Sequence, residues 1–381
     1  MSRDFIRQLD DNHDLRRTQS VWNRLCLDPV LLLMLLLFCA AGLFVLYSAN
    51  GRDMAMIMRQ STYLAIGFVV MAVVAQVPQR LMQRLTPYAY GAAVVLLVGV
   101  LIIGIESKGA QRWISLPGFR FQPSEILKLV MPLTIAGWLS RHPLPPGYKE
   151  IGVSLLMIGI PVVLILEQPD LGTALLIAVS GIFVLLLAGL RWRIIGTAVL
   201  LAIPAIWAMW HFVMHGYQKQ RVLTFLNPES DPWGSGWNII QSKIAIGSGG
   251  LYGKGWLLGT QSHLDFLPES HTDFIIAVLA EEFGLLGVAV LLAAYALIIG
   301  RGIYIAMNAQ TLYGRLIAGS ITLTFFVYVF VNIGMVSGLL PVVGVPLPLV
   351  SRGGTSIVTL MAGFGVLMSV HTHKNFLGRY T

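Results

Sequence analysis

Long runs of apolar residues alternate with short polar connections along almost the whole chain. A helix needs about 20 mostly apolar residues to cross the hydrocarbon core of a bilayer. The candidate spans are roughly 29–49, 60–77, 86–105, 124–140, 151–167, 171–189, 193–214, 272–300, 315–340 and 351–370. The pattern therefore predicts an all-α polytopic integral membrane protein with about ten transmembrane helices.

The composition agrees with this prediction. Hydrophobic residues make up 56% of the chain and charged residues 12%, whereas a typical soluble domain has about 25% charged residues. So few charges could not cover a surface in water, which excludes an ordinary soluble enzyme as well as a disordered or fibrous protein. Cys26 and Cys39 lie at the start of the first apolar region. We interpret them as small membrane-facing side chains rather than as a disulfide or a metal site.

Lys and Arg gather in one set of connections, which predicts the orientation. Because cytoplasmic loops are enriched in these residues, we expect both termini in the cytoplasm, which agrees with an even number of spans. The expected parts are a cytoplasmic tail over 1–28, one membrane domain over 29–370 and a second cytoplasmic tail over 371–381. Arg59 and Arg112 are expected in short loops on the outer side. Short loops account for most of the net charge of +8, so nucleic-acid binding is not needed to explain it.

One connection is much longer than the others. Residues 215–271 join the seventh and eighth spans on the expected outer face, and glycines recur among apolar and aromatic residues along them. This pattern is typical neither of a flexible linker nor of a transmembrane helix. We interpret it as short amphipathic helices and turns packed on the membrane surface. A long ordered loop of this kind is usually functional.

Three acidic residues are expected at membrane depth or at helix mouths. Ionisable groups at membrane depth are costly and are functional by default. Glu125 and Lys128 lie inside the fourth span, and their spacing of three residues places them on one helix face. They form either a structural ion pair or a charged wall of a substrate cavity. Asp170 lies between the fifth and sixth spans. It either caps the sixth helix or faces a cavity on the outer side.

Asp273 is the third acid, and it lies where the long outer loop enters the eighth span. With Ser270 or Thr272 as the helix cap, Asp273 would fall in the first helical turn, where a carboxylate complements the helix dipole. Alternatively, an acid at the mouth of a bundle is well placed to act as a general base. Glu281 and Glu282 follow eight and nine residues later. They lie too far along the helix to form a catalytic pair with Asp273, so we expect them to serve packing or hydrogen bonds between helices.

Ser351 and Arg352 open the tenth span in the segment PLPLVSRGGTS. The prolines before them and the glycines after them predict an irregular backbone. Exposed backbone N–H groups beside an arginine form an anion site, and the alternative is a simple turn. The sequence contains no nucleotide-binding fingerprint or hydrolase motif, and no two histidines have the spacing of a zinc site on one helix.

Together these motifs resemble the SEDS family, the polytopic bacterial proteins of shape, elongation, division and sporulation. The resemblance covers nearly the whole chain after the first tail. The segments that carry it are FQPSEILKL, EQPDLGTA, IAIGSGGLYGKG, FLPESHTDFIIAVLAEEFG and NIGMVSGLLPVVGVPLPLVSRGGTS. The form VVGVPLPLVSRGG is similar to that of the elongation members rather than the division members.

The resemblance implies a peptidoglycan glycosyltransferase of the bacterial cytoplasmic (inner) membrane that polymerises lipid II on the outer face during cell elongation. It implies that Asp273 is the essential acid, with Glu125, Lys128 and Asp170 in the cavity. The implied partners are a class B penicillin-binding protein (a transpeptidase), other membrane proteins of the elongation complex, undecaprenyl-linked nascent glycan and the lipid bilayer, with no nucleic acid.

The implied reaction needs one base for the acceptor hydroxyl, which would be Asp273, and positive charge for the departing pyrophosphate. Arg352, Lys128 and Lys243 are candidates for that charge, and Ser351 is a further cavity candidate. A divalent cation, Mg²⁺ or Mn²⁺, held in part by Asp273, is an alternative source of the charge. Two other functions stay open. One is a lipid II flippase, and the other is a non-catalytic scaffold for the penicillin-binding protein.

Overall fold

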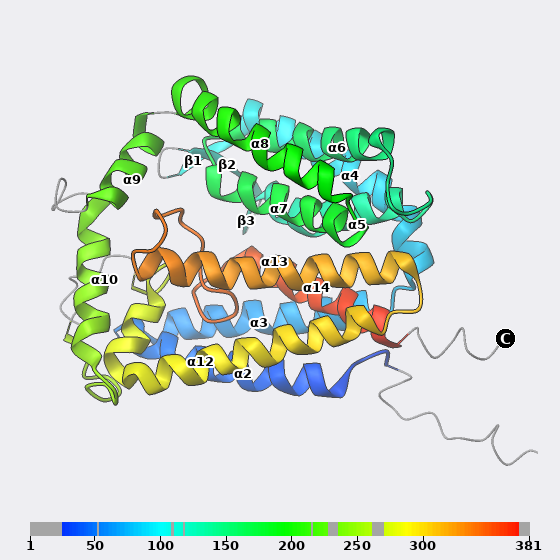
Figure 1. The fold of residues 1–381 in the computed structure, drawn as a ribbon. Coiled ribbons are helices and arrows are strands. Elements are labelled where there is room, and N and C mark those ends of the chain that lie inside the picture. Colours follow the sequence, from blue (N-terminus) through cyan, green and yellow to red (C-terminus); the bar gives the residue numbers. More distant parts are fainter. Residues whose placement is uncertain are drawn as a thin grey trace, which may run out of the picture.

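The computed structural model describes residues 25–51, 53–107, 110–116, 119–214, 216–227, 235–260 and 270–372. Every predicted span contains a helix, and in these ranges eight helices are long and apolar enough to cross a membrane. The helices of the spans are α2 (Pro29–Ala49), α3 (Met54–Ala75), α4 (Gln79–Ile103), α5 (Pro123–Leu139), α6 (Tyr148–Glu167), α7 (Leu171–Leu187), α8 (Trp192–Ala208), α12 (Ile275–Met307), α13 (Leu312–Val336) and α14 (Gly354–Thr372). They run alongside one another as a bundle (Figure 1), which confirms the helical polytopic fold. Most of both expected tails lies outside the described residues.

Aspartates determine where two of the spans begin. Asp28 caps α2 by accepting a hydrogen bond from the N–H of Val30 at 3.1 Å. Asp53 caps α3 in the same way through Ala55 at 2.9 Å. Because of this cap, α3 begins six residues earlier than the apolar run suggested. Arg59, which was expected in an outer loop, therefore lies within α3.

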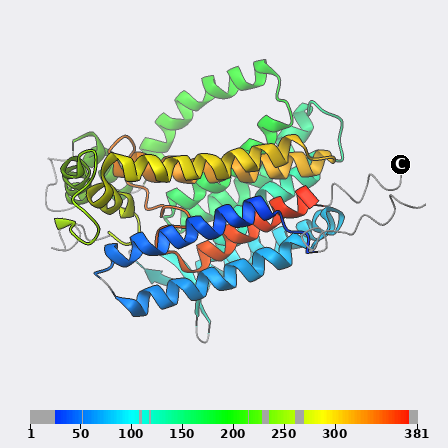
Figure 2. The ribbon, with the colours of Figure 1, turned by 90° about the horizontal axis from the view of Figure 1, so that it is seen from below.

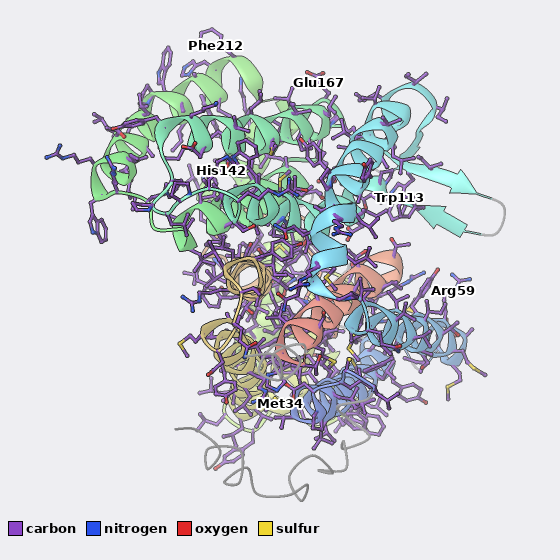
Figure 3. The ribbon with its side chains drawn as sticks, turned by 90° about the vertical axis from the view of Figure 1, so that its right-hand side faces the viewer. Met34, Arg59, Trp113, His142, Glu167 and Phe212 are labelled. Atoms are coloured by element: carbon purple, nitrogen blue, oxygen red, sulfur yellow. The ribbon has the colours of Figure 1, made fainter. Side chains whose placement is uncertain are left out.

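A small antiparallel sheet connects α4 and α5, where the sequence predicted only a short loop. Its strands are β1 (Ile105–Ser107), β2 (Ala110–Leu116) and β3 (Phe119–Phe121), and β2 pairs with both of the others. Figure 3 shows the sheet projecting from the side of the bundle, with Trp113 near its base. Strands of three to seven residues are too short to display a clear alternation of polar and apolar positions. Arg112 lies in β2 rather than in a loop.

The long connection between α8 and α12 contains further helices in its described parts. A π-helical turn, η2 (Met209–Val213), continues α8 and is followed by α9 (Gly216–Leu226) and α10 (Ser235–Gly249). Figure 1 shows α9 and α10 lying across one end of the bundle, and α10 packs against α12 and α13. These residues confirm the short helices expected in this loop, whereas their contact with a membrane surface stays a prediction. Residues 228–234 and 261–269 lie outside the described ranges.

The helices differ greatly in how much of their surface other helices cover. α13 is central, because it packs against α5, α7, α12 and α14. α8 is peripheral: none of its residues is buried, and Figure 2 shows it standing apart from the rest of the bundle. The start of α2 and the end of α14 lie at the same end of the bundle in Figures 1 and 2, opposite α9 and α10.

α12 is interrupted near its start, where Gly284 has a φ of 65° and a ψ of −162°. Two carbonyl oxygens of the preceding turn, those of Glu281 and Glu282, accept hydrogen bonds from outside the helix. The donors are the N–H groups of Lys254 and Gly255, each at 3.0 Å. The segment after α10 is therefore fixed to α12 by main-chain hydrogen bonds.

We predict that Gly253→Ala lowers the free energy of unfolding more than Gly250→Ala. Both glycines have positive φ angles, +79° and +57°, so either alanine costs about 1–2 kcal/mol of left-handed strain. Only at Gly253 would the new Cβ clash, because it would lie 2.1 Å from the carbonyl oxygen of Glu282. Relieving such a clash costs about 1–3 kcal/mol more. Thermal unfolding of the full-length chain in detergent measures both losses, and equal losses would contradict tight packing of this segment on α12.

Candidate active site

A cavity of about 1130 Å³ lies among the helices that surround α13. Its wall is formed by the early turns of α3, α5 and α7, by α13 and α14 and by the irregular segment between them. Parts of β2, of α12 and of the turn before α12 complete it. Most of the charged side chains come from the starts of α3, α5 and α7, whereas Arg112 comes from β2 and Arg352 from the segment before α14. Ile299, Phe364 and Leu367 line the wall deeper in the bundle. The cavity thus combines a polar mouth with an apolar interior.

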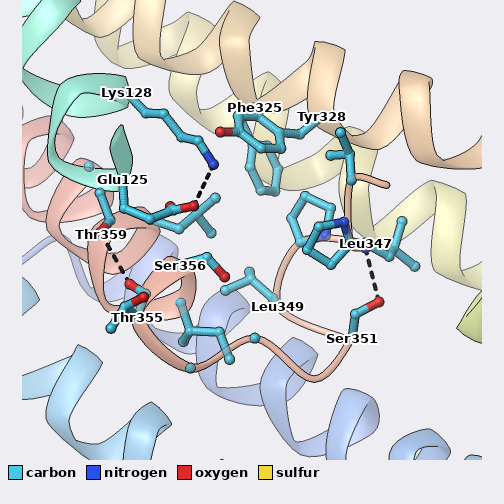
Figure 4. Close-up of a pocket in the computed structure, with 18 of the residues that line it drawn as sticks. Glu125, Lys128, Phe325, Tyr328, Leu347, Leu349, Ser351, Thr355, Ser356 and Thr359 are labelled. Carbon is cyan, nitrogen blue, oxygen red and sulfur yellow. Dashed lines mark hydrogen bonds and ion pairs between the residues drawn. The ribbon is translucent and has the colours of Figure 1, made fainter. Parts of the chain in front are cut away.

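The ion pair of α5 forms part of this wall. Lys128 Nζ lies 2.6 Å from Glu125 Oε1 (Figure 4) and 5.3 Å from the centre of the Tyr328 ring on α13. The side chains of Lys128 and Glu125 are only 14% and 8% exposed. The two sequence interpretations are therefore compatible, because the structural ion pair is also a charged part of the cavity wall.

Asp170 connects three elements at the mouth of the cavity. Its Oδ1 accepts a hydrogen bond from the N–H of Thr173 at 3.2 Å, and its Oδ2 accepts one from the Thr173 hydroxyl at 2.9 Å. This arrangement confirms that Asp170 caps α7. Oδ2 also accepts a hydrogen bond from Gln122 Nε2 at 3.3 Å and lies 3.4 Å from Nε of Arg112. The carboxylate therefore holds the sheet and the start of α5 against α7.

Two other arginines line the cavity without a carboxylate partner among the described residues. Arg59 on α3 is exposed, and Arg352 in the segment before α14 is half-buried. Lys128 and Arg112 are already paired with acids. In the described part of the wall, Arg59 and Arg352 are thus the arginines whose charge is not neutralised by an ion pair. A guanidinium group is well suited to bind phosphate.

Asp273 lies in the turn that leads into α12, so the expectation that it would fall in the first helical turn was wrong. α12 begins only at Ile275, and the Asp273 carbonyl accepts a hydrogen bond from Nδ2 of Asn332 at 2.9 Å. Asp273 is not itself a lining residue, but its neighbour Thr272 is, and so is Gly344. A Cβ on Gly344 would lie 3.6 Å from Asp273 Oδ2. The half-buried carboxylate is therefore at the edge of the cavity.

Two further candidates occupy different environments. Ser351 is buried in the wall, and its hydroxyl accepts a hydrogen bond from the N–H of Leu347 at 2.9 Å and donates one to the carbonyl of Thr272. Lys243 is exposed on α10 beside Gly338 and does not belong to the described cavity wall. The predicted residues that the structure brings together in the wall are Glu125, Lys128, Asp170, Ser351 and Arg352.

Glu281 and Glu282 serve packing, as the sequence analysis expected. Both are fully buried. Glu281 Oε1 accepts hydrogen bonds from Lys254 Nζ at 2.7 Å and from the N–H of Thr260 at 2.8 Å. Glu282 accepts a hydrogen bond from the hydroxyl of Ser48 on α2. The two acids therefore fix the segment after α10 and the end of α2 to α12.

Four residues that shape the site were not predicted from the sequence. Arg59 and Arg112 were attributed to loops because polar residues interrupt the apolar runs around them. Tyr328 and Asn332 lie inside the apolar span of α13. A buried amide in a membrane helix is a detectable signal, because it needs hydrogen-bond partners there, but the sequence does not indicate which partners it finds.

Comparisons with known proteins agree along the length of the chain. A protein-family model named FTSW_RODA_SPOVE and described as cell cycle protein matches residues 25–376. The chain is 55% identical over 361 residues to the peptidoglycan glycosyltransferase MrdB of Escherichia coli (strain K12), covering 95% of this chain and 98% of the relative. It is 37% identical over 358 residues to the probable peptidoglycan glycosyltransferase FtsW of Geobacter sulfurreducens (strain DL-1 / KN400), covering 91% and 95%.

Two solved structures are also similar to this chain over most of its length. A chain from "Structural coordination of polymerization and crosslinking by a peptidoglycan synthase complex" has a TM-score of 0.79 and 34% identity, covering 91% of this chain and 98% of that chain. The rod shape determining protein RodA of Thermus thermophilus has a TM-score of 0.70 and 30% identity, covering 91% and 97%.

We predict that Glu125→Gln or Lys128→Met alone destabilises the protein more than the two substitutions together. Removing one partner leaves the other charge buried and unpaired, which costs about 3–5 kcal/mol, whereas removing both avoids that penalty. A double-mutant cycle on thermal unfolding in detergent measures the coupling. If the stability losses of the two single variants add up to the loss of the double variant, the two charges are not coupled as a buried ion pair.

Proposed function

Because this chain belongs to the FtsW/RodA/SpoVE family and is a peptidoglycan glycosyltransferase, we propose that it polymerises lipid II with Asp273 as the general base. The observation that carries this proposal is the position of Asp273. Its carboxylate lies beside Gly344 at the edge of a cavity with a polar mouth and an apolar interior. Such a cavity is suited to a substrate with a charged headgroup and a prenyl chain.

In the proposed reaction the 4-hydroxyl oxygen of the acceptor sugar attacks C1 of the donor sugar. A β-1,4 bond forms while the α-linked bond from C1 to the pyrophosphate breaks, so one displacement inverts C1. The hydroxyl proton passes to the Asp273 carboxylate, and undecaprenyl pyrophosphate leaves with the electron pair of the broken bond. Gly344 presents no side chain beside the carboxylate, which leaves room for the acceptor hydroxyl.

The departing pyrophosphate needs positive charge, and Arg352 is the best placed of the candidates that the sequence suggested. It lines the cavity and has no carboxylate partner among the described residues, whereas Lys128 is neutralised by Glu125. Lys243 lies apart from the described wall. Arg59, which was expected in an outer loop, would be a second guanidinium for the same phosphates.

A divalent cation near Asp273 would find few protein ligands among the described residues. In the ranges that the structure describes, no three His, Cys, Asp or Glu side chains are grouped closely enough to hold a metal ion. A Mg²⁺ or Mn²⁺ ion near Asp273 could take further ligands from pyrophosphate and water. The proposed reaction is therefore written for the protein's own residues.

The proposed partner is a class B penicillin-binding protein, with other membrane proteins of the elongation complex. Polymerisation and crosslinking are coordinated in the synthase complex to which one of the similar structures belongs. The proposed location is the bacterial cytoplasmic membrane, with both termini in the cytoplasm. One observation supports the placement of both termini on the same side: the start of α2 and the end of α14 lie at one end of the bundle, opposite α9 and α10.

We predict that Asp273→Asn abolishes strand formation, because removing a positioned base costs about 10²–10⁴-fold in rate. The assay uses lipid II and the full-length chain co-purified in detergent with its penicillin-binding protein. Asp53→Asn is the matched control, because Asp53 is an exposed helix cap and asparagine caps equally well. Strands made by the unaltered protein in detergent cannot result from flipping, since no second leaflet exists there. Near-normal activity of the Asp273→Asn protein would exclude the base role.

We predict that Arg352→Gln lowers kcat/KM for lipid II by about 10- to 100-fold. This loss corresponds to the free energy that hydrogen bonds to a charged group contribute. Arg352→Lys should retain part of the activity, because an ammonium supplies the charge but not the planar fork. Arg193→Gln, an exposed substitution at the start of α8, is the control. If the kinetics of Arg352→Gln match those of this control, Arg352 does not bind the pyrophosphate.

A further inference from the structure

We infer that Asn332 of α13, together with the Ser351 hydroxyl, is a positioning residue that sets where the Asp273 carboxylate lies relative to the cavity. The inference rests on the proposed role of Asp273 as the base. Neither Asn332 nor Ser351 needs to touch the substrate to act in this way, since both act through the backbone of the turn that carries Asp273.

Asn332 joins two segments that are far apart in the sequence. Its side chain is completely buried, and Nδ2 donates hydrogen bonds to the Asp273 carbonyl at 2.9 Å and to the Val345 carbonyl at 2.7 Å. Because both neighbours are carbonyl oxygens, only the amide nitrogen can face them. One amide group therefore holds the turn before α12 and the segment before α14 at a fixed separation.

The two residues before Asp273 are held by the same segment. The Ser351 hydroxyl donates a hydrogen bond to the Thr272 carbonyl, and the N–H of Arg352 donates one to the His271 carbonyl at 3.0 Å. Three successive carbonyls of the turn therefore each accept a hydrogen bond from α13 or from the segment that follows it. We call these three hydrogen bonds the carbonyl clamp.

The segment that provides the clamp is itself anchored to other helices. Gln60 Nε2 on α3 donates a hydrogen bond to the Ser351 carbonyl at 3.1 Å. The Tyr295 hydroxyl on α12 donates one to the Pro348 carbonyl at 2.6 Å. The clamp therefore fixes the Asp273 turn to a rigid frame rather than to a mobile loop.

Geometry, rather than stability alone, explains why an amide occupies this position. Asn332 Oδ1 is buried and has no hydrogen-bond partner among the described residues, and an unpaired buried acceptor is costly. Val345 follows Gly344, the glycine that lies against Asp273 Oδ2. Asn332 thus fixes both sides of the contact between the carboxylate and the cavity wall.

Loss of the clamp should affect the chemical step more than substrate binding. A displacement of about 1 Å at the reacting groups can cost about 10²-fold in rate. The cavity wall and the arginines that face it do not depend on the Asn332 side chain for their charge. A defect in the clamp should therefore lower kcat and leave KM nearly unchanged.

The test compares Asn332→Ala and the nearly isosteric Asn332→Asp with Ser320→Ala in the same helix. Ser320 is also completely buried and donates a hydrogen bond to a carbonyl, that of Ser180 at 2.7 Å, but it contacts α7 instead of the Asp273 turn.

Lipid II polymerisation is measured with the full-length chain co-purified with its penicillin-binding protein. Both Asn332 variants are expected to lose about 10- to 100-fold in kcat, with KM within about twofold of the unaltered value. Hydrogen exchange should accelerate in residues 270–275 of these variants only.

Several outcomes would overturn the inference. One is a kcat of Asn332→Ala equal to that of Ser320→Ala, and another is a raised KM with an unchanged kcat. If Asn332→Ala cannot be purified, Ser351→Ala carries the same expectation, and a change in KM alone would make Ser351 a substrate contact instead. Activity of Asp273→Asn would overturn the base role itself, whereas an inactive Asp273→Asn with normal Asn332 variants would overturn only the clamp.

Discussion

Backbone polar groups in the irregular segments beside the cavity must find hydrogen bonds inside the protein, because lipid offers none. The turn at 270–274 and the segment 337–353 have no helical ladder of their own. Buried polar side chains of neighbouring helices supply the missing partners, namely Gln60, Tyr295 and Asn332. The bonds that make an irregular backbone tolerable within the bundle therefore also place Asp273 at the cavity edge.

Hydropathy predicted the helices well, because each span must present enough apolar surface to lipid over its whole length. Its errors occurred where polar residues belong to a helix or where an element is short. The start of α3 was missed because Arg59 and Gln60 interrupt the apolar run, although Asp53 is a recognisable cap. The small sheet was missed because its strands are too short for a periodic pattern, although it supplies Arg112 to the cavity wall.

Charged site residues could be predicted because few charged residues occur within the apolar spans. Glu125 and Lys128 could be paired from their spacing alone, and the cap at Asp170 follows from local sequence. The location of Asp273 before the helix depends on Asn332, which is 59 residues away in the sequence. A contact of this range leaves no local pattern, and a neutral amide is easily overlooked beside charged residues. The sequence thus predicts which acids to consider but not what holds them in place.

In the proposed reaction Asp273 lies within reach of the acceptor hydroxyl while Arg352 faces the pyrophosphate. This arrangement can be seen in a cryo-electron microscopy structure of the Asp273→Asn variant with lipid II bound, in complex with its penicillin-binding protein. We expect an acceptor 4-hydroxyl at about 2.6–3.2 Å from the side chain at position 273, with a pyrophosphate beside Arg352. Sugars bound out of reach of position 273, or a pyrophosphate held at Lys243 on α10, would contradict it.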